Sequence, residues 1–146
     1  MNHPKKDVMH AARELALNLL FQMDVAHLSA EEAFQTAREN AKTDPESIEQ
    51  AIAFADGVLE RQARLDSVLN ELSPEWPADR QPSVDRNILR LAMFEMSFYQ
   101  QTPQAVVIDE AIELAKKFST EDSGRFVNGV LGEFMRRFNN RELSIK

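Results

Sequence analysis

The chain has 146 residues and no cysteine, and its 17 basic against 24 acidic side chains give a formal net charge of −7. This charge excludes proteins that coat nucleic acid through an overall basic surface, because their affinity comes from counterions released as phosphates are neutralised. The lack of cysteine excludes disulfide scaffolds, thiolate metal sites and cysteine nucleophiles.

Three helices are predicted in the first half of the chain. Apolar residues recur at three-and-four spacing over 8–27, as on one face of an α-helix. Ser29 and Glu32 then form a capping box that begins a second, shorter helix. Asp44 before Pro45 begins a third, because a side-chain acceptor and a first-turn proline both favour a helix start. The apolar positions of this third helix continue to Leu72.

The chain has one internal seam, at 73–82. It contains three prolines and the only tryptophan, Trp76, so a helix cannot continue through it. The segment is too short to separate independent domains. We therefore predict a single domain over 1–146, whose halves, about 1–72 and 83–146, are joined by this crossover.

The second half reads as three further helices. The first runs from Ser83 to the stop at Thr102-Pro103, Pro103 opens the next, and Ser119 or Thr120 caps the last. With few glycines and few β-branched residues, the chain is predicted to be all-α, with six to seven helices and no strand.

The sequence shows no pattern typical of a metal, cofactor or catalytic site. Its three histidines lack the spacing of helical metal ligands, and there is no glycine-rich phosphate loop. Gly129 and Gly132 of the last helix are instead predicted to let another helix approach closely. The carboxylates of Asp109, Glu110 and Glu113 suit a helix N-terminus and solvated ion pairs better than acid–base catalysis.

Nothing in the sequence indicates a membrane protein or a secreted one. No apolar run approaches the roughly 20 residues that span a bilayer, and the N-terminus lacks the apolar stretch of a secretory signal. We expect a cytoplasmic protein.

The charge is unevenly distributed. Residues 28–72 hold ten acidic and four basic side chains, a net of −6, so the rest of the chain is nearly neutral. Small basic clusters lie outside this stretch: Lys5, Lys6 and Arg13, Arg86 with Arg90, Lys116 with Lys117, Arg125, and Arg136 with Arg137.

Three motifs of the second half are more specific. They are Asp85-Arg-Asn-Ile-Leu-Arg-Leu-Ala-Met-Phe-Glu-Met, Ile108-Asp-Glu-Ala-Ile-Glu-Leu-Ala-Lys-Lys-Phe and Glu121-Asp-Ser-Gly-Arg-Phe-Val-Asn-Gly-Val-Leu-Gly. In this order and spacing the chain closely resembles the NusB family of bacterial transcription antitermination factors. Its first helix, from Ala12-Arg-Glu-Leu to Asp24, is similar to the opening helix of that family.

The resemblance implies two three-helix bundles side by side. It also implies a non-catalytic adaptor that pairs with the ribosomal protein NusE. The pair would bind the single-stranded boxA element of nascent ribosomal RNA, within an antitermination complex with RNA polymerase.

The resemblance also implies an RNA-binding face. The family's arginine-rich N-terminal segment corresponds here to Lys5, Lys6 and Arg13, a sparser set than the family pattern. Phe21 stands where the family often has a tyrosine, and we interpret it as a core residue rather than a base-stacking one. Other positions that match the RNA face lie at the starts of the first and last helices of the second half: Asp85, Arg86, Asp122, Ser123, Arg125, Phe126 and Asn128.

Two other functions stay open. The sparse N-terminal basic residues are compatible with a protein-only helical adaptor or dimer that has lost RNA binding, and the free protein is a possible homodimer. The chain also resembles the RNA-binding module of 5-methylcytosine ribosomal-RNA methyltransferases, although the Gly-rich cofactor loop and the cysteines of their catalytic domain are not found in these 146 residues. The acidic stretch 28–72 is interpreted as a face for a basic partner that also suppresses indiscriminate RNA binding.

Overall fold

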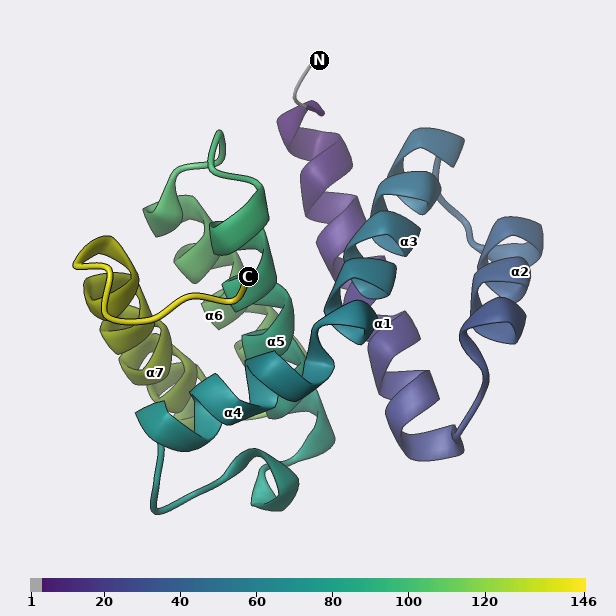
Figure 1. The fold of residues 1–146 in the computed structure, drawn as a ribbon. Helices are drawn as coiled ribbons and strands as arrows, with labels where there is room; N and C mark the ends of the chain where they lie inside the picture. The colour runs from purple at the N-terminus through teal and green to yellow at the C-terminus, as the bar shows by residue number, and fades with distance from the viewer. Residues whose placement is uncertain (1–3) are drawn as a thin grey trace.

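A computed structural model describes residues 4–146, which form helices, the turns between them and a C-terminal segment without regular structure (Figure 1). The α-helices are α1 (Lys6–Ala26), α2 (Ala30–Asn40), α3 (Pro45–Glu60), α4 (Gln62–Leu72), α5 (Ser83–Phe98), α6 (Gln104–Phe118) and α7 (Glu121–Asn139). A single 3-10 turn, η1 (Ala78–Arg80), lies in the crossover. The predicted all-α class is confirmed.

Local capping explains where several helices begin. The side chain of Ser29 accepts a hydrogen bond from the Glu32 amide at 3.1 Å, and Asp44 accepts one from the Ser47 amide at 2.9 Å. Thr120, one of the two predicted caps, accepts from the Ser123 amide at 3.0 Å. Each bond satisfies an amide that has no partner within its own helix.

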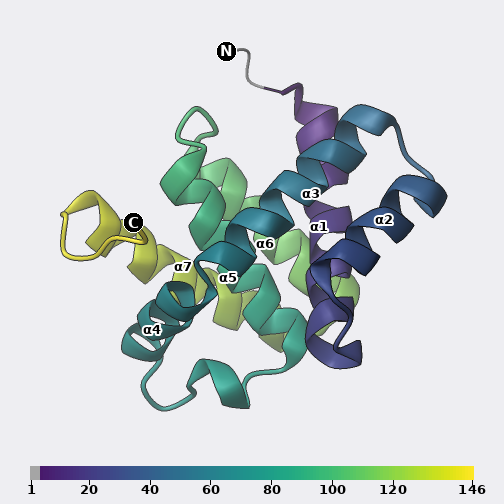
Figure 2. The same cartoon turned by 45° about the vertical axis from the view of Figure 1, so that its right-hand side comes forward.

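The helices form two bundles that share one core. Helices α1, α2 and α3 pack together, as do α5, α6 and α7, and α1 and α3 also contact α5. Figures 1 and 2 show the bundles side by side, with α5 at their junction. The largest fully buried side chains include Phe54 of α3, Leu89 of α5 and Phe134 of α7.

The predicted third helix is wrong beyond Glu60. The backbone leaves helical geometry at Arg61 (φ −115°, ψ 15°), and a separate helix, α4, starts at the next residue. Helix α4 packs against α5 and α7 as well as α3, although it precedes the crossover (Figure 1). Tertiary contacts therefore place α4 with the second bundle, whereas its sequence position suggested the first.

The close helix approach is at a different glycine from the two predicted. A Cβ added at Gly129 or Gly132 would meet no atom within 4 Å, so neither lets another helix approach. A Cβ at Gly57 would lie 2.1 Å from Cζ of Phe94. The absent side chain of Gly57 is thus what lets α3 pack against the aromatic ring of α5.

Candidate nucleic-acid interface

The predicted site residues fall into two groups that lie far apart. Lys5 and Lys6 are exposed at the start of α1, whereas the residues of α5 and α7 gather where those helices begin. Asp24, near the other end of α1, contacts Arg86 of the second group. At 1.5 Å per helical residue, Lys6 and Asp24 are separated by about 27 Å along α1.

Arg13 does not belong to an exposed basic cluster. It is 4% exposed and donates from Nε and Nη2 to the two carboxylate oxygens of Glu95, at 2.8 and 2.6 Å. Glu95 of α5 is itself 1% exposed, and Glu110 of α6 lies 3.6 Å from Arg13 Nη1. The predicted RNA ligand is therefore occupied in a buried ion pair where α1, α5 and α6 meet.

Asp85 and Ser123 are also buried, and they bind each other. The Ser123 hydroxyl donates to Oδ2 of Asp85 at 2.9 Å, which ties the start of α7 to the start of α5. In the described part of the chain, Oδ1 of Asp85 and Oε1 of Gln81 are the buried side-chain oxygens or nitrogens without a partner. Asp85 and Ser123 thus position the start of α7 and present no surface of their own to RNA.

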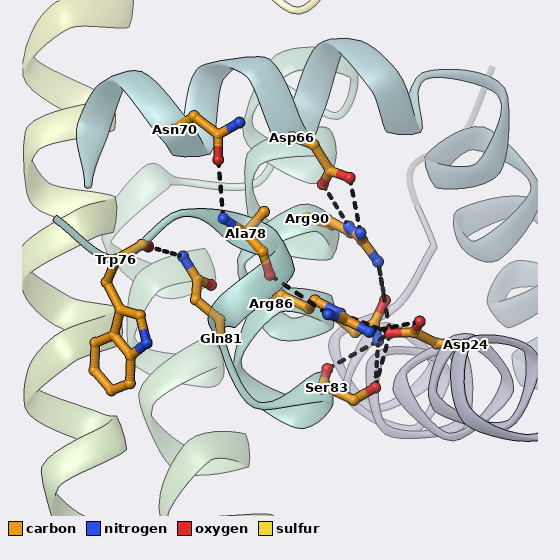
Figure 3. Close-up of polar contacts among 10 residues, drawn as sticks. Asp24, Asp66, Asn70, Trp76, Ala78, Gln81, Ser83, Arg86 and Arg90 are labelled. Carbon is orange, nitrogen blue, oxygen red and sulfur yellow. Dashed lines mark hydrogen bonds and ion pairs between the residues drawn. The ribbon is translucent and has the colours of Figure 1, made fainter. Parts of the chain in front are cut away.

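Arg86 is half-buried in a polar network around Asp24 (Figure 3). Its guanidinium donates to both oxygens of Asp24, at 2.7 and 2.8 Å, while Ser83 and Asn87 donate to Oδ2. Partial burial disfavours the charged carboxylate, but the hydrogen bonds from Arg86, Ser83 and Asn87 outweigh it and lower the pKa of Asp24 to about 2. The hydrogen bonding of Arg86 to Asp24 in turn raises the pKa of Arg86.

A second ion pair supports this junction. Arg90, one turn further along α5, donates to both oxygens of Asp66 on α4, at 2.7 and 2.8 Å. Arg90 also donates to Oδ1 of Asn87 at 3.0 Å, so the two carboxylates are joined through α5. The network connects α1, α4 and α5 beside the crossover (Figure 3).

The start of α7 presents an open polar face. Asp122, Arg125 and Asn128 are exposed and follow one another at three-residue spacing, so they lie on the same side of the helix. Arg125 and Asp122 form an exposed ion pair. An exposed ion pair of this kind is weak and readily opens toward another charged or hydrogen-bonding partner.

Phe126 is half-buried because a second aromatic ring covers part of it. The ring of Trp76, from the crossover, lies against it with centroids 5.2 Å apart and planes inclined by 51°. Trp76 itself is 44% exposed. It was missing from the predicted site because 50 residues of sequence separate it from Phe126.

Two lysines of α6 lie between the predicted groups. Lys117 binds Glu14 of α1 at 2.7 Å, and the Lys116 side chain runs alongside Gly124 of α7. Both lysines are exposed. They therefore form a basic connection from the α1 surface to the start of α7.

The other basic cluster is partly neutralised by a carboxylate of its own helix. Arg136 and Arg137 both bind Glu133, at 2.8 and 2.9 Å. Their hydrogen bonds, first that of Arg136, lower the pKa of Glu133 to about 2. This end of α7 has less free positive charge than its sequence suggests.

The interpretation of Phe21 as a core residue is wrong. Its side chain is 37% exposed on α1, near Val25 and Leu28, which are also exposed.

Within residues 4–146 no group of three or more histidine or acidic side chains is placed to hold a metal ion. None of the helices there is long and apolar enough to cross a bilayer.

A family model described as the NusB family matches residues 10–136. The chain belongs to the NusB family. It is 46% identical to the transcription antitermination protein NusB of Desulforudis audaxviator over 83% of this chain and 88% of that protein. Against NusB of Bacillus subtilis the identity is also 46%, over 82% and 88% of the two chains.

Solved structures of NusB proteins share the fold. NusB of T. maritima superposes with a TM-score of 0.80 at 32% identity, covering 98% of this chain and all of that one. A chain from the crystal structure of antitermination factors NusB and NusE in complex with dsRNA gives a TM-score of 0.79 at 27% identity, over 88% and 96%. The NusB match starts at His10, so Lys5 and Lys6 lie outside the shared region whereas all of α5, α6 and the start of α7 lie within it.

Proposed function

We propose that this chain is a non-catalytic RNA-binding adaptor of transcription antitermination in the bacterial cytoplasm. It pairs with NusE, and the pair binds single-stranded boxA RNA within a complex that contains RNA polymerase. The observation that carries the proposal is the open polar face of α7, Asp122, Arg125 and Asn128, on a fold whose relatives include NusB in complex with NusE and RNA.

The predicted site residues divide into those that contact RNA and those that hold the RNA-contacting residues in place. The RNA ligands are the exposed members of the predicted set, together with Lys116 of α6 and the half-buried Phe126: Lys5, Lys6, Lys116, Asp122, Arg125, Phe126 and Asn128. Cationic side chains contact phosphates, while Asp122 and Asn128 offer hydrogen bonds to base edges. Arg13, Asp85 and Ser123 stay behind this surface, and Arg86 supports it through Asp24.

The salt dependence of binding tests the phosphate contacts. With about three to five cationic contacts, log affinity for single-stranded RNA falls against log salt concentration with a slope of roughly −2 to −3.5, at about −0.7 per contact. Titrations of boxA RNA and of a scrambled strand at several salt concentrations measure both this slope and the sequence preference. An affinity that does not change with salt contradicts the proposal.

The pairing with NusE is tested by repeating these titrations with and without NusE. The proposal expects the pair to bind boxA RNA more tightly than either protein alone. Glu31 and Glu32 lie in the first turn of α2, whereas Glu46 and Glu49 lie near the start of α3, where Arg38 of α2 already binds Glu49 at 2.9 Å. The start of α2 and the start of α3 are thus two candidate acidic surfaces for a basic partner. Neutralising Glu31 with Glu32, and separately Glu46 with Glu49, tests the two surfaces. The variant that binds NusE more weakly identifies the surface that NusE uses. A variant that instead binds RNA more tightly identifies the surface that limits RNA binding.

A protein-only role is the second candidate, favoured by one observation. Phe21, Val25 and Leu28 expose apolar surface at the end of α1, as expected of an interface with another protein or a second copy of this chain. Sedimentation equilibrium of the free protein detects a homodimer. A dimer that binds no RNA with or without NusE supports this candidate over the first.

A further inference from the structure

Trp76 and Phe126 form an aromatic surface at the end of the molecule where α5 and α7 begin. The two rings are tilted rather than stacked face to face, and Trp76 is 44% exposed. Part of the indole is therefore accessible from solvent, whereas full burial in the core would have covered both of its faces. A flat apolar face is thus available to a flat ligand.

The crossover holds this indole in one orientation. Its Nε1 donates to the carbonyl oxygen of Arg80 at 3.1 Å, and the Trp76 carbonyl accepts from the side chains of Ser73 and Gln81, both at 3.0 Å. The Ala78 amide donates to Asn70 of α4 at 2.9 Å, which ties the loop to its neighbouring helix (Figure 3). A ring held in place loses little side-chain entropy when a ligand covers it.

The surroundings of Trp76 favour a nucleobase over an apolar protein surface. In residues 4–146, the other large apolar side chains that are exposed lie on α1, on the turn after it and on α6, none of them on the crossover or α7. The residues next to Phe126 along the exposed side of α7 are instead Asp122, Arg125 and Asn128. An isolated aromatic face among charged and amide groups is suited to stacking a base whose phosphate and edges are bound beside it.

We infer that Trp76 is a base-stacking residue of the RNA site, with Phe126 as the ring that supports it. This inference rests on the proposed function. It also requires the RNA to be single-stranded, because the bases of a duplex are already stacked on one another and do not present a free face. The ligand of this surface is therefore an unpaired base of single-stranded RNA.

The fluorescence of the native protein tests the inference directly, since Trp76 is its only tryptophan. We expect single-stranded boxA RNA to quench the emission as binding saturates. The same sequence as a duplex should bind, if at all, without quenching. Affinity is followed in parallel by a method that does not use fluorescence. RNA that binds by that method but leaves the emission unchanged refutes the stacking role alone, whereas no binding by either method refutes the proposed function as well.

Two variants with a matched control measure the contribution of the ring. Trp76→Ala should weaken binding about 5- to 150-fold, the range for losing one aromatic stacking partner, with an unchanged salt slope because no charge is removed. Trp76→Phe should retain most of the affinity. Val106→Ala, which truncates a side chain of similar exposure (42%) at the far end of α6, should leave binding unchanged. Equal affinities of wild type and Trp76→Ala, with both proteins folded by circular dichroism, contradict the inference.

Discussion

Arg13 and Arg125 each stand beside a carboxylate, and both belong to segments that resemble an RNA-binding family, yet their surroundings are opposite. Arg13 and Glu95 are enclosed where α1, α5 and α6 meet, whereas Arg125 and Asp122 extend into solvent from the start of α7. The difference shows that a basic residue in a motif shared with the family can either stabilise the fold or be available to bind a ligand. Burial, which depends on residues far away in the sequence, decides between the two.

The enclosed pair should produce the largest effect on stability. Arg13→Met leaves the Glu95 charge buried without its partner, so we expect a loss of about 3–5 kcal/mol in the free energy of unfolding. Urea denaturation measures this loss. The double variant Arg13→Met with Glu95→Leu removes both charges and should recover most of the stability. If the double variant is as unstable as the single one, the ion pair itself rather than the isolated charge is what stabilises the fold.

Substituting a buried glycine and an exposed glycine by alanine should change the stability of the protein in opposite directions. Gly57→Ala places a methyl group against the Phe94 ring, so the buried ring or the helices around it must shift, at a cost of about 1–3 kcal/mol. Gly129→Ala lies on the open side of α7 with no atom within 4 Å and should stabilise the protein by about 0.5–1 kcal/mol. Thermal unfolding of both variants measures the contrast. Two changes of the same sign would contradict it.

Acid should weaken the junction between the bundles at Asp24. The folded pKa of about 2 lies below the ordinary value of 3.8, so the stabilisation is complete above pH 3.8 and is lost as the pH falls from there toward 2. The partly open site reduces the expected loss to about 1–2 kcal/mol. Unfolding of the wild type and of Asp24→Asn at a series of pH values isolates this contribution. The difference between the two proteins should shrink as the pH falls through this interval, and a constant difference would contradict the prediction.

Removing Arg125 should have the smallest effect on stability and should mainly weaken RNA binding. Because its ion pair is exposed, Arg125→Ala should change the free energy of unfolding by no more than about 0.5 kcal/mol. Its RNA affinity should fall for every sequence, with the salt slope reduced by about 0.7. Lys5→Ala with Lys6→Ala should also weaken binding to every sequence, with the salt slope reduced by about 1.4 because two cations are removed. Asp122→Asn should instead alter the preference between boxA and scrambled RNA. A change in preference for the lysine variant would show that the lysines contact bases.

Most residues of the candidate RNA site were named from the family motifs, but the motifs do not distinguish residues that could contact RNA from residues that support them. Asp122, Arg125 and Asn128 are exposed as an RNA ligand must be, whereas Asp85 and Ser123 bind each other. Trp76 was expected to fold back on the core, but it is 44% exposed, and nothing in the sequence placed it beside Phe126, which is 50 residues away. Lys116 and Lys117 were visible as a basic pair, but only their contacts with Gly124 and Glu14 place them beside the predicted site.

By itself the sequence determined the helices and their caps, because hydrogen bonds such as that from the Glu32 amide to Ser29 join residues three apart. It also determined the family, through motifs carried within single helices. Only the tertiary structure decided that α3 ends at Glu60, that Gly57 rather than Gly129 allows a close contact, and that Arg13 is enclosed while Arg125 is open. These outcomes depend on what packs against each residue, and the partners, such as Phe94 and Glu95, come from helices distant in the chain.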